Sequence, residues 1–218
     1  MHDTGELFES LGSPSGSEPL APGAWVLRGF ALPAAASLLT ALEGIGAAAP
    51  FRHLHTPGGF RMSVAMTNCG SLGWVSDRHG YRYQSFDPVS GAPWPPMPED
   101  FMALARAAAR AGGFPSFTPD ACLINRYEPG ARLTLHQDKD ERDFSSPIVS
   151  MSFGLSATFL FGGIRRSDRQ QRIPLRHGDV VVWGGASRLR HHGVLPIKAG
   201  RHDLLGPVRV NLTFRRAA

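Results

Sequence analysis

The sequence predicts a mainly β protein with flanking helices, an α+β fold whose core is a double-stranded β-helix, the two-sheet jelly roll. The main observation is a series of about eight short strand-like runs after residue 120, separated by Gly, Pro, Asp or Ser. Short strands with turn signals between them favour a double sheet over a parallel βαβ sheet. The chain has 218 residues, 42% of them hydrophobic, which is enough for one domain with a substantial core.

The first half of the chain is predicted to hold a leader, a strand and two helices. Residues 1–23 are rich in Ser, Gly, Pro and Glu and lack periodicity, so we expect a flexible leader. A short strand is expected at 25–30, followed by a helix at 33–46, where proline favours the first turn and leucines recur on one side. A second amphipathic helix is expected at 98–110, ended by the glycines at 112–113.

The second half reads as β almost throughout, and we expect it to form the catalytic core. We divide the chain into the leader, an N-terminal extension at 24–118 and a jelly-roll core at 119–218, with the last two forming one globular unit. The predicted strands of the core are 121–127, 131–136, 147–155, 157–162, 171–175, 179–183, 192–197 and 208–215.

A pair of metal-ligand side chains lies at the end of the second of these strands and directly after it. His136 and Asp138 are two residues apart, so on an extended strand they point the same way and can bind one ion together. Two imidazoles and one carboxylate with open positions form the facial triad of non-haem Fe(II) oxygenases. His191 and His192, at the start of a late strand, both qualify as the third ligand, and side-chain direction cannot be decided from the pattern.

A second His-x-Asp pair competes with the first. His177 and Asp179 have the same spacing, but they precede the apolar run at 180–183, where Gly-Asp is typical of a turn that leads into a buried strand. We therefore favour the pair at 136 and 138.

The last predicted strand carries polar and basic side chains on one face. Arg209, Asn211, Thr213 and Arg215 alternate with apolar residues. Guanidinium groups inside a barrel are expensive to bury unless an anion meets them, and a dicarboxylate would do so. The alternative is a solvated basic strand at the edge of a sheet.

Aromatic and basic residues alternate in a stretch of the N-terminal extension. Trp74, Tyr81 and Tyr83 lie close to Arg78 and Arg82. Rings that stack on bases and cations that meet phosphates are the requirements of a groove for single-stranded nucleic acid. The alternative is that these rings are core or edge residues of a sheet.

Charge and cysteine content bear on partners and location. The formal net charge of +5 is consistent with a polyanionic partner. Cys69 and Cys122 lie in apolar surroundings and suit a reducing compartment. No apolar run reaches membrane-spanning length. We expect a cytoplasmic protein that is monomeric and does not bind a membrane.

Several long motifs together carry a resemblance to a known family. They are TPGGF (56–60), MSVAMTNCG (62–70), LGW (72–74), PDACLINRYEPGARLTLHQDKDE (119–141), PIVSMSFGL (147–155), HGDVVVWGG with SRL (177–189) and VNLTFR (210–215). In these motifs, and over nearly all of the chain after about residue 20, it resembles the Fe(II)/2-oxoglutarate dioxygenases of the AlkB family. The motifs are far more specific than a lone His-x-Asp pair.

The resemblance implies a set of ligands for iron and the co-substrate. Fe(II) would be bound by His136, Asp138 and His192, the histidine directly before a glycine. The residues that would contact 2-oxoglutarate, with O2 as the further substrate, are Asn125, Tyr127, Leu133, Ile148, Ser150, Arg209, Asn211, Thr213 and Arg215.

The resemblance also implies a substrate and a nucleotide-recognition lid. Family members remove alkyl groups from ring nitrogens of bases such as 1-methyladenine and 3-methylcytosine, in single-stranded DNA and often RNA, with release of formaldehyde and succinate. Trp74 and His136 would enclose the flipped base. The other implied contacts are Tyr81, Arg82 and Tyr83 to the nucleotide backbone, Asp140 and Arg166 to the base, and Thr56 and Met66 in the lid.

Two positions depart from the family pattern, and two other functions stay open. His191 stands where an aromatic residue is usual, and Val210 stands where tyrosine is usual. We expect His191 to face outward. A hydroxylase of a small molecule or protein side chain, or a jelly-roll binding module without catalysis, are the alternatives to a nucleic-acid demethylase.

Overall fold

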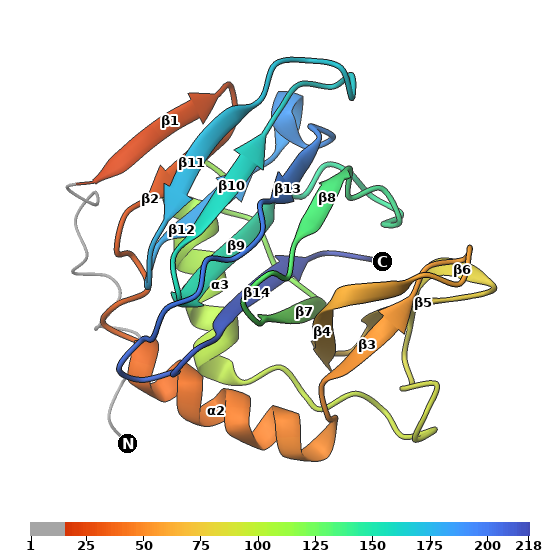
Figure 1. Ribbon diagram of the computed structural model, residues 1–218. Coiled ribbons are helices and arrows are strands. Elements are labelled where there is room, and N and C mark those ends of the chain that lie inside the picture. Colours follow the sequence, from red (N-terminus) through yellow and green to blue (C-terminus); the bar gives the residue numbers. More distant parts are fainter. Residues whose placement is uncertain (1–15) are drawn as a thin grey trace.

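The chain folds into two facing β-sheets with two helices on the outer side of the larger sheet (Figure 1). The computed structural model describes residues 16–218. The larger sheet has the order β1 (Ser17–Ala21), β2 (Ala24–Leu27), β12 (Val180–Trp183), β9 (Ile148–Gly154), β14 (Arg209–Arg215), β7 (Ala121–Tyr127), β4 (Arg61–Gly70) and β3 (Arg52–His55). The smaller sheet has the order β11 (Gln171–Leu175), β10 (Ala157–Phe161), β13 (His192–Val194) and β8 (Leu133–His136).

A β-hairpin, two α-helices and a short 3-10 turn complete the fold. β5 (Gly73–Asp77) and β6 (Gly80–Gln84) form a separate antiparallel hairpin. The helices are α2 (Ala35–Ala48) and α3 (Glu99–Ala111), and a short 3-10 turn, η1 (Gly185–Ser187), precedes β13. Among residues 16–218, none of the helices has the length and apolar character needed to cross a membrane.

The central strands of the larger sheet are apolar on both faces because both faces are covered. In β12, Val180 and Val182 belong to the cluster that packs beneath the helices, whereas Val181 and Trp183 belong to the cluster between the two sheets. This alternation explains why β12 appears in the sequence as a continuous apolar run. The sheet therefore supports helices on one side and a functional interior on the other.

The helices pack through small and apolar residues. In α3, Phe101, Leu104 and Ala108 are buried, and Phe101 meets Phe214 of β14 edge to face. The helix ends at Gly112, where an added Cβ would lie 2.7 Å from a Val182 side-chain carbon. Only glycine allows the chain to pass so close to the sheet.

The predicted fold class is confirmed, with one correction near the N-terminus. The predicted strand at 121–127 matches β7, and the helix predicted at 98–110 matches α3 within one residue. The predicted leader at 1–23 is wrong for its last part, because Ser17–Ala21 pairs with β2 as strand β1. The remainder of that leader, 1–15, lies outside the described residues.

Strand β14 is an interior strand, so the alternative of a solvated edge strand is wrong. It pairs with β7 on one side and with β9 on the other, and all seven of its residues are buried. Its polar face therefore lies inside the protein, where buried polar groups need partners.

Candidate metal centre

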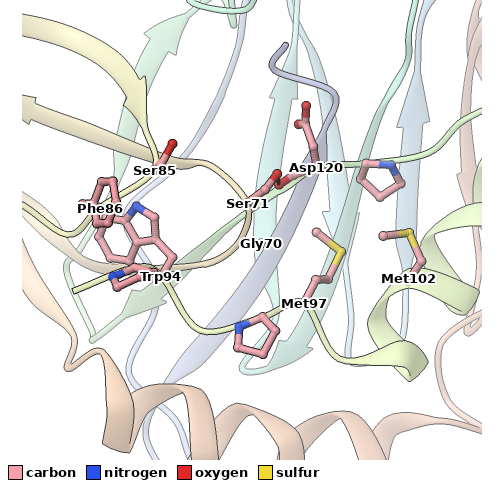
Figure 2. A pocket seen from close by; sticks show the side chains of 11 residues that line it. Gly70, Ser71, Ser85, Phe86, Trp94, Met97, Met102 and Asp120 are labelled. Carbon is pink, nitrogen blue, oxygen red and sulfur yellow. Dashed lines mark hydrogen bonds between the residues drawn. The ribbon is translucent and has the colours of Figure 1, made fainter.

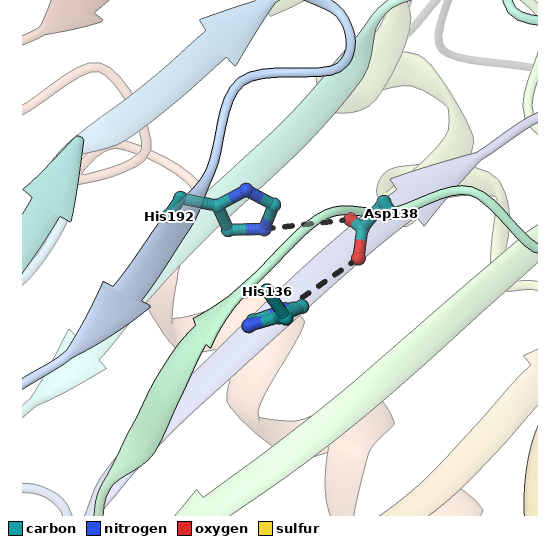
Figure 3. Close-up of side chains that lie close together, drawn as sticks. All are labelled: His136, Asp138 and His192. Carbon is teal, nitrogen blue, oxygen red and sulfur yellow. Dashed lines mark ion pairs between the residues drawn. The ribbon is translucent and has the colours of Figure 1, made fainter. Parts of the chain in front are cut away.

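Two antiparallel strands of the smaller sheet bring the histidines together. His136, the last residue of β8, lies directly opposite His192, the first residue of β13. At Gly193 an added Cβ would lie 2.8 Å from the carbonyl oxygen of Leu133, so glycine allows the two strands to approach. Asp138 follows β8 by two residues, and Figure 3 shows its carboxylate facing both rings.

The three side chains have the geometry of a metal site. Their ligand atoms all lie within 4.8 Å of one another. The Nε2 atom of His136 is 3.6 Å from Oδ1 of Asp138, and that of His192 is 3.7 Å from Oδ2 (Figure 3). A metal ion at this centre would be held by Nε2 of each histidine and by the carboxylate of Asp138.

Backbone carbonyl groups orient both imidazoles. Nδ1 of His136 lies 2.9 Å from the carbonyl oxygen of Thr134, and Nδ1 of His192 lies 3.0 Å from that of Arg190. When each Nδ1–H donates to its carbonyl group, the lone pair of Nε2 faces the centre. The protein thus presents two imidazole nitrogens and one carboxylate to a common centre.

The charges at the centre favour the protonation states that a metal needs. Burial alone would raise the pKa of Asp138, but the positive charge of Arg215 and the two histidines outweigh it and hold that pKa well below its usual range. Burial, with the neighbouring His136, lowers the pKa of His192 to about 3. A deprotonated carboxylate and a neutral imidazole are the forms that bind metal.

The competing pair is occupied by structural contacts. Oδ2 of Asp179 accepts a hydrogen bond of 2.8 Å from Arg28, and Oδ1 accepts one from the backbone N–H of Gly29. Nδ1 of His177 accepts the backbone N–H of Gly154 at 3.1 Å. These contacts give the second His-x-Asp pair a role in joining strands. His191 is half-buried rather than facing fully outward, and it lies outside the cluster of three.

A polar ladder covers the inner face of the larger sheet. Arg209, Asn211 and Arg215 of β14 lie directly opposite Tyr127, Asn125 and Ala121 of β7. Asn211 Nδ2 donates to Ser150 Oγ at 2.8 Å, and Thr213 Oγ1 donates to Asn211 Oδ1 at 2.8 Å. Ile148 is buried in β9, and Leu133 is half-buried in β8.

Arg209 is a buried cation with donor atoms to spare. Its Nη2 donates to Ser152 Oγ at 3.0 Å, and its guanidinium carbon lies 4.8 Å from the centre of the Tyr127 ring. Nε and Nη1 are buried without a hydrogen-bond partner among residues 16–218, as is Oδ1 of Asn125. Burial lowers the pKa of Arg209. Unpaired N–H donors of this kind are costly, so the residues present fit a carboxylate ligand.

The hairpin β5–β6 carries the predicted nucleotide contacts. The rings of Trp74 and Tyr81 stack with centroids 5.5 Å apart and an angle of 13° between their planes. Trp74 Nε1 donates to Asp140 Oδ2 at 2.8 Å, which fixes the indole beside the segment that carries Asp138. Trp74 is half-buried and packs against the apolar cluster between the sheets, whereas Tyr81 is 46% exposed, so neither ring is fully enclosed by the fold.

Two other predicted contacts on the hairpin have partners within the protein. Arg82 is paired with Asp77 at 2.8 Å and also donates to Gln84. The Tyr83 hydroxyl donates to Glu141 Oε1 at 2.7 Å, a partner inside the protein. This geometry does not favour the predicted direct contact between Tyr83 and a phosphate group.

The remaining predicted substrate residues surround the site at different depths. Arg166 is exposed, and its Nη1 donates to the carbonyl oxygen of Leu135, next to His136, at 2.6 Å. Thr56 closes the turn between β3 and β4 by accepting the backbone N–H of Phe60. Met66 is 4% exposed and lies opposite Asn125 in the interior.

The family follows from comparison with known proteins. The model of the 2OG-Fe(II) oxygenase superfamily matches residues 23–215. The alpha-ketoglutarate-dependent dioxygenase AlkB of Salmonella typhimurium is 61% identical over 201 residues, which cover 92% of this chain and 93% of that protein. The chain belongs to the 2OG-Fe(II) oxygenase superfamily, and within it to the AlkB dioxygenases. It is an enzyme that uses Fe(II), 2-oxoglutarate and O2.

Two further relatives of this AlkB dioxygenase extend the comparison. The solved structure of OsALKBH1 superposes with a TM-score of 0.81 at 31% identity, covering 92% of this chain and 100% of that one. The human nucleic acid dioxygenase ALKBH1 is 36% identical over 123 residues, which cover 56% of this chain and 31% of that protein. The fold match agrees with the jelly-roll core predicted from the strand pattern.

Two buried residues of the AlkB site were not predicted from the sequence. Glu141 forms ion pairs with Arg188 at 3.1 Å and with Arg215 at 3.3 Å. Arg188 also donates to the backbone carbonyl oxygen of Asp138 at 2.8 Å. The available signals were the charged run at the end of the 119–141 motif for Glu141 and the SRL motif at 187–189 for Arg188, and neither says which charges are buried.

A cavity lined by none of the metal-centre residues lies elsewhere in the protein. It has a volume of about 560 Å³ and is mainly apolar (Figure 2). Its lining includes Ser71, Phe86, Trp94, Met97, Met102 and Asp120. The lining contains none of the predicted iron, co-substrate or nucleotide contacts.

Proposed function

We propose that this AlkB dioxygenase is an oxidative demethylase that removes N-linked alkyl groups from bases such as 1-methyladenine and 3-methylcytosine in single-stranded DNA, and in RNA as a second substrate class. The observation that carries the proposal is the bond between Trp74 Nε1 and Asp140. Asp140 follows Asp138 by two residues, so this bond supports a stacking surface at Trp74 beside the proposed metal centre. A flipped base on that surface would lie next to the metal.

We assign each residue one part of the reaction. Fe(II), 2-oxoglutarate and O2, when bound, supply the oxidation of the N-alkyl carbon, whose hydroxylated form leaves as formaldehyde while 2-oxoglutarate becomes succinate and CO2. His136, Asp138 and His192 would bind the metal from one side, and Arg209 with Tyr127 and Asn211 would hold the dicarboxylate.

The surroundings would select the damaged base. Trp74 would stack on it, and the free oxygen of Asp140 would favour an alkylated base that carries positive charge. Such a base has lost Watson–Crick pairing, so its extrusion costs less than that of a normal base. The net charge of +5 supports binding to the phosphate backbone. Because all proposed ligands come from one chain, we expect the monomer to be active.

A turnover assay tests this function. The enzyme is loaded with Fe(II) and 2-oxoglutarate without oxygen, then exposed to air with oligonucleotides that carry 1-methyladenine or 3-methylcytosine. We expect formaldehyde and succinate in equal amounts, with single-stranded DNA preferred over duplex and over the unmethylated control. Succinate production that no oligonucleotide stimulates would instead support a hydroxylase of a small molecule or protein side chain.

A further inference from the structure

Two consecutive carboxylates hold the hairpin β5–β6 at two points. Trp74 and Tyr83 lie directly opposite each other across the hairpin. Trp74 donates to Asp140 at 2.8 Å, and the Tyr83 hydroxyl donates to the next residue, Glu141, at 2.7 Å. Burial raises the pKa of Tyr83 well above its ordinary value, so its hydroxyl keeps the proton that it donates. The proposed base-stacking strand and its partner are thus both attached to the segment that follows Asp138.

Glu141 continues this connection to the metal centre. Its Oε1 lies 3.3 Å from Nε of Arg215, and Arg215 donates to Oδ2 of Asp138 from Nε at 2.9 Å and from Nη2 at 2.7 Å. The side chains of Glu141, Arg215 and Asp138 are 2%, 7% and 9% exposed. A continuous series of buried polar contacts therefore runs from the hairpin to a metal ligand.

A second arginine keeps Glu141 in place. Arg188, with a side chain 3% exposed, pairs with Glu141 at 3.1 Å and donates to the backbone carbonyl oxygen of Asp138 at 2.8 Å. Each buried charge here depends on its neighbours, because an uncompensated charge away from water is very costly. A movement of Tyr83 would therefore shift Glu141, with which its hydroxyl is hydrogen-bonded. Glu141 would in turn shift Arg215, which holds the carboxylate of Asp138.

We propose that Glu141 is a positioning residue that links the seating of nucleic acid on hairpin β5–β6 to the geometry of Asp138, so that oligonucleotide and metal bind cooperatively. The inference rests on the proposed function. Linkage of this kind is reciprocal: if the oligonucleotide tightens metal binding by some factor, the metal tightens oligonucleotide binding by the same factor.

The test measures binding without turnover. Co(II) affinity is measured by titration without oxygen, in the presence of 2-oxoglutarate, with and without a single-stranded oligonucleotide that carries 1-methyladenine. In the wild-type enzyme we expect the oligonucleotide to tighten Co(II) binding by about fivefold or more. In Glu141→Gln and in Tyr83→Phe, which removes one hydroxyl group, this ratio should fall to about one. In the double variant, the ratio of Co(II) affinities with and without the oligonucleotide should fall no further than in either single variant.

Controls separate coupling from a structural role. Glu128→Gln makes the same substitution in a surface ion pair with Arg126, where the Glu128 side chain is 62% exposed, and should keep the wild-type ratio. A merely structural Glu141 would lower thermal stability without changing the ratio. Tyr83→Phe provides the answer if Glu141→Gln does not fold.

The outcomes distinguish this inference from the proposed function. The inference is overturned if Tyr83→Phe keeps the wild-type ratio, or if the wild-type ratio is itself about one while the enzyme binds and demethylates the oligonucleotide. An enzyme that neither binds methylated oligonucleotides nor releases formaldehyde from them would remove the proposed function, and this inference with it.

Discussion

Arg215 donates two hydrogen bonds to a single oxygen of Asp138, from Nε at 2.9 Å and from Nη2 at 2.7 Å. The resemblance to AlkB implied that Arg215 contacts the co-substrate, and the structure shows that it contacts the carboxylate of the candidate metal centre. Asp138 is thereby kept ionised in a buried position. The orientation of this ligand depends on the last strand of the fold.

The first prediction follows from that pair. Arg215→Ala leaves Asp138 and Glu141 buried with one cation fewer, and should lower the free energy of unfolding of the metal-free protein by about 3–5 kcal/mol. Urea unfolding monitored by tryptophan fluorescence measures it. Glu128→Gln, at the surface, should change it by less than about 1 kcal/mol. A similarly small loss for Arg215→Ala would show that the buried pair contributes little.

The second prediction concerns the metal ligands. His136→Ala removes one proposed ligand, whose side chain is 37% exposed. It should weaken Co(II) binding by more than about 100-fold, which is a larger loss than is usual for residues that only hydrogen-bond to a metal ligand. Titration of the metal-free protein measures this. His177→Ala, in the competing His-x-Asp pair, should leave Co(II) affinity unchanged. A loss of less than tenfold for His136→Ala would argue against this centre.

Asp138→Ala is a less informative change than the sequence alone suggests. As one ligand of an open site, Asp138 alone would predict loss of turnover with an intact fold. In the structure, however, removal of the carboxylate leaves Arg215 buried with a weaker partner, so we expect the change also to destabilise the fold. Asp138→Asn keeps an oxygen acceptor for Arg215 and removes the anionic metal ligand, so it separates the two effects better.

The strands were predictable where the sequence alternates or runs apolar for a physical reason. β14 was placed within one residue because polar and apolar residues alternate along it, and β7 was placed because it begins as a continuous apolar run. β1 was missed because Ser, Glu and Pro are poor strand formers, and its structure comes from pairing with β2. Such tertiary pairing overrides local preference and leaves no local signal.

The site was predictable only where its residues are close in sequence. His136 and Asp138 are two residues apart, whereas the choice between His191 and His192 depends on the register of β13 against β8. The contact between Arg215 and Asp138 spans 77 residues. Nothing in one sequence indicates that Glu141 turns inward while Asp140 stays exposed, because that depends on the position of hairpin β5–β6.

The third prediction uses the spare donors of Arg209. Arg209→Met has a similar volume and removes a buried cation whose Nε and Nη1 lack partners among the described residues. Without ligand, the variant should be as stable as the wild type or more stable. Its gain in thermal stability on adding 2-oxoglutarate should nevertheless nearly vanish, because the carboxylate has lost its cation. Calorimetry with and without 2-oxoglutarate measures the stability of the ligand-free variant and its rise on adding 2-oxoglutarate. A rise as large as in the wild type would exclude Arg209 as a contact of 2-oxoglutarate.

The fourth prediction concerns the stacked ring of the hairpin. Trp74→Ala should weaken binding of a single-stranded oligonucleotide by about 1–3 kcal/mol through lost stacking. Trp74→Phe keeps a ring but loses the Nε1–H donor to Asp140, so its affinity for the oligonucleotide should fall less than that of Trp74→Ala. Fluorescence anisotropy with a labelled oligonucleotide measures both affinities. Equal affinity of Trp74→Ala and the wild type would show that this ring does not contact the nucleic acid.

The fifth prediction concerns pH and the stacked imidazoles of His177 and His202, whose centroids are 4.4 Å apart. Burial, and then the charge of His202, lowers the pKa of His177 below its ordinary value. At pH values between the lowered pKa and the ordinary one, the unfolded chain therefore binds more protons than the folded protein. Folding stability consequently rises as the pH increases through this window. His202→Gln removes the second cause only. It should raise the pKa of His177 part of the way back, as measured by NMR titration, and reduce the loss of stability at acid pH. An unchanged pKa of His177 would show that the two rings do not interact electrostatically.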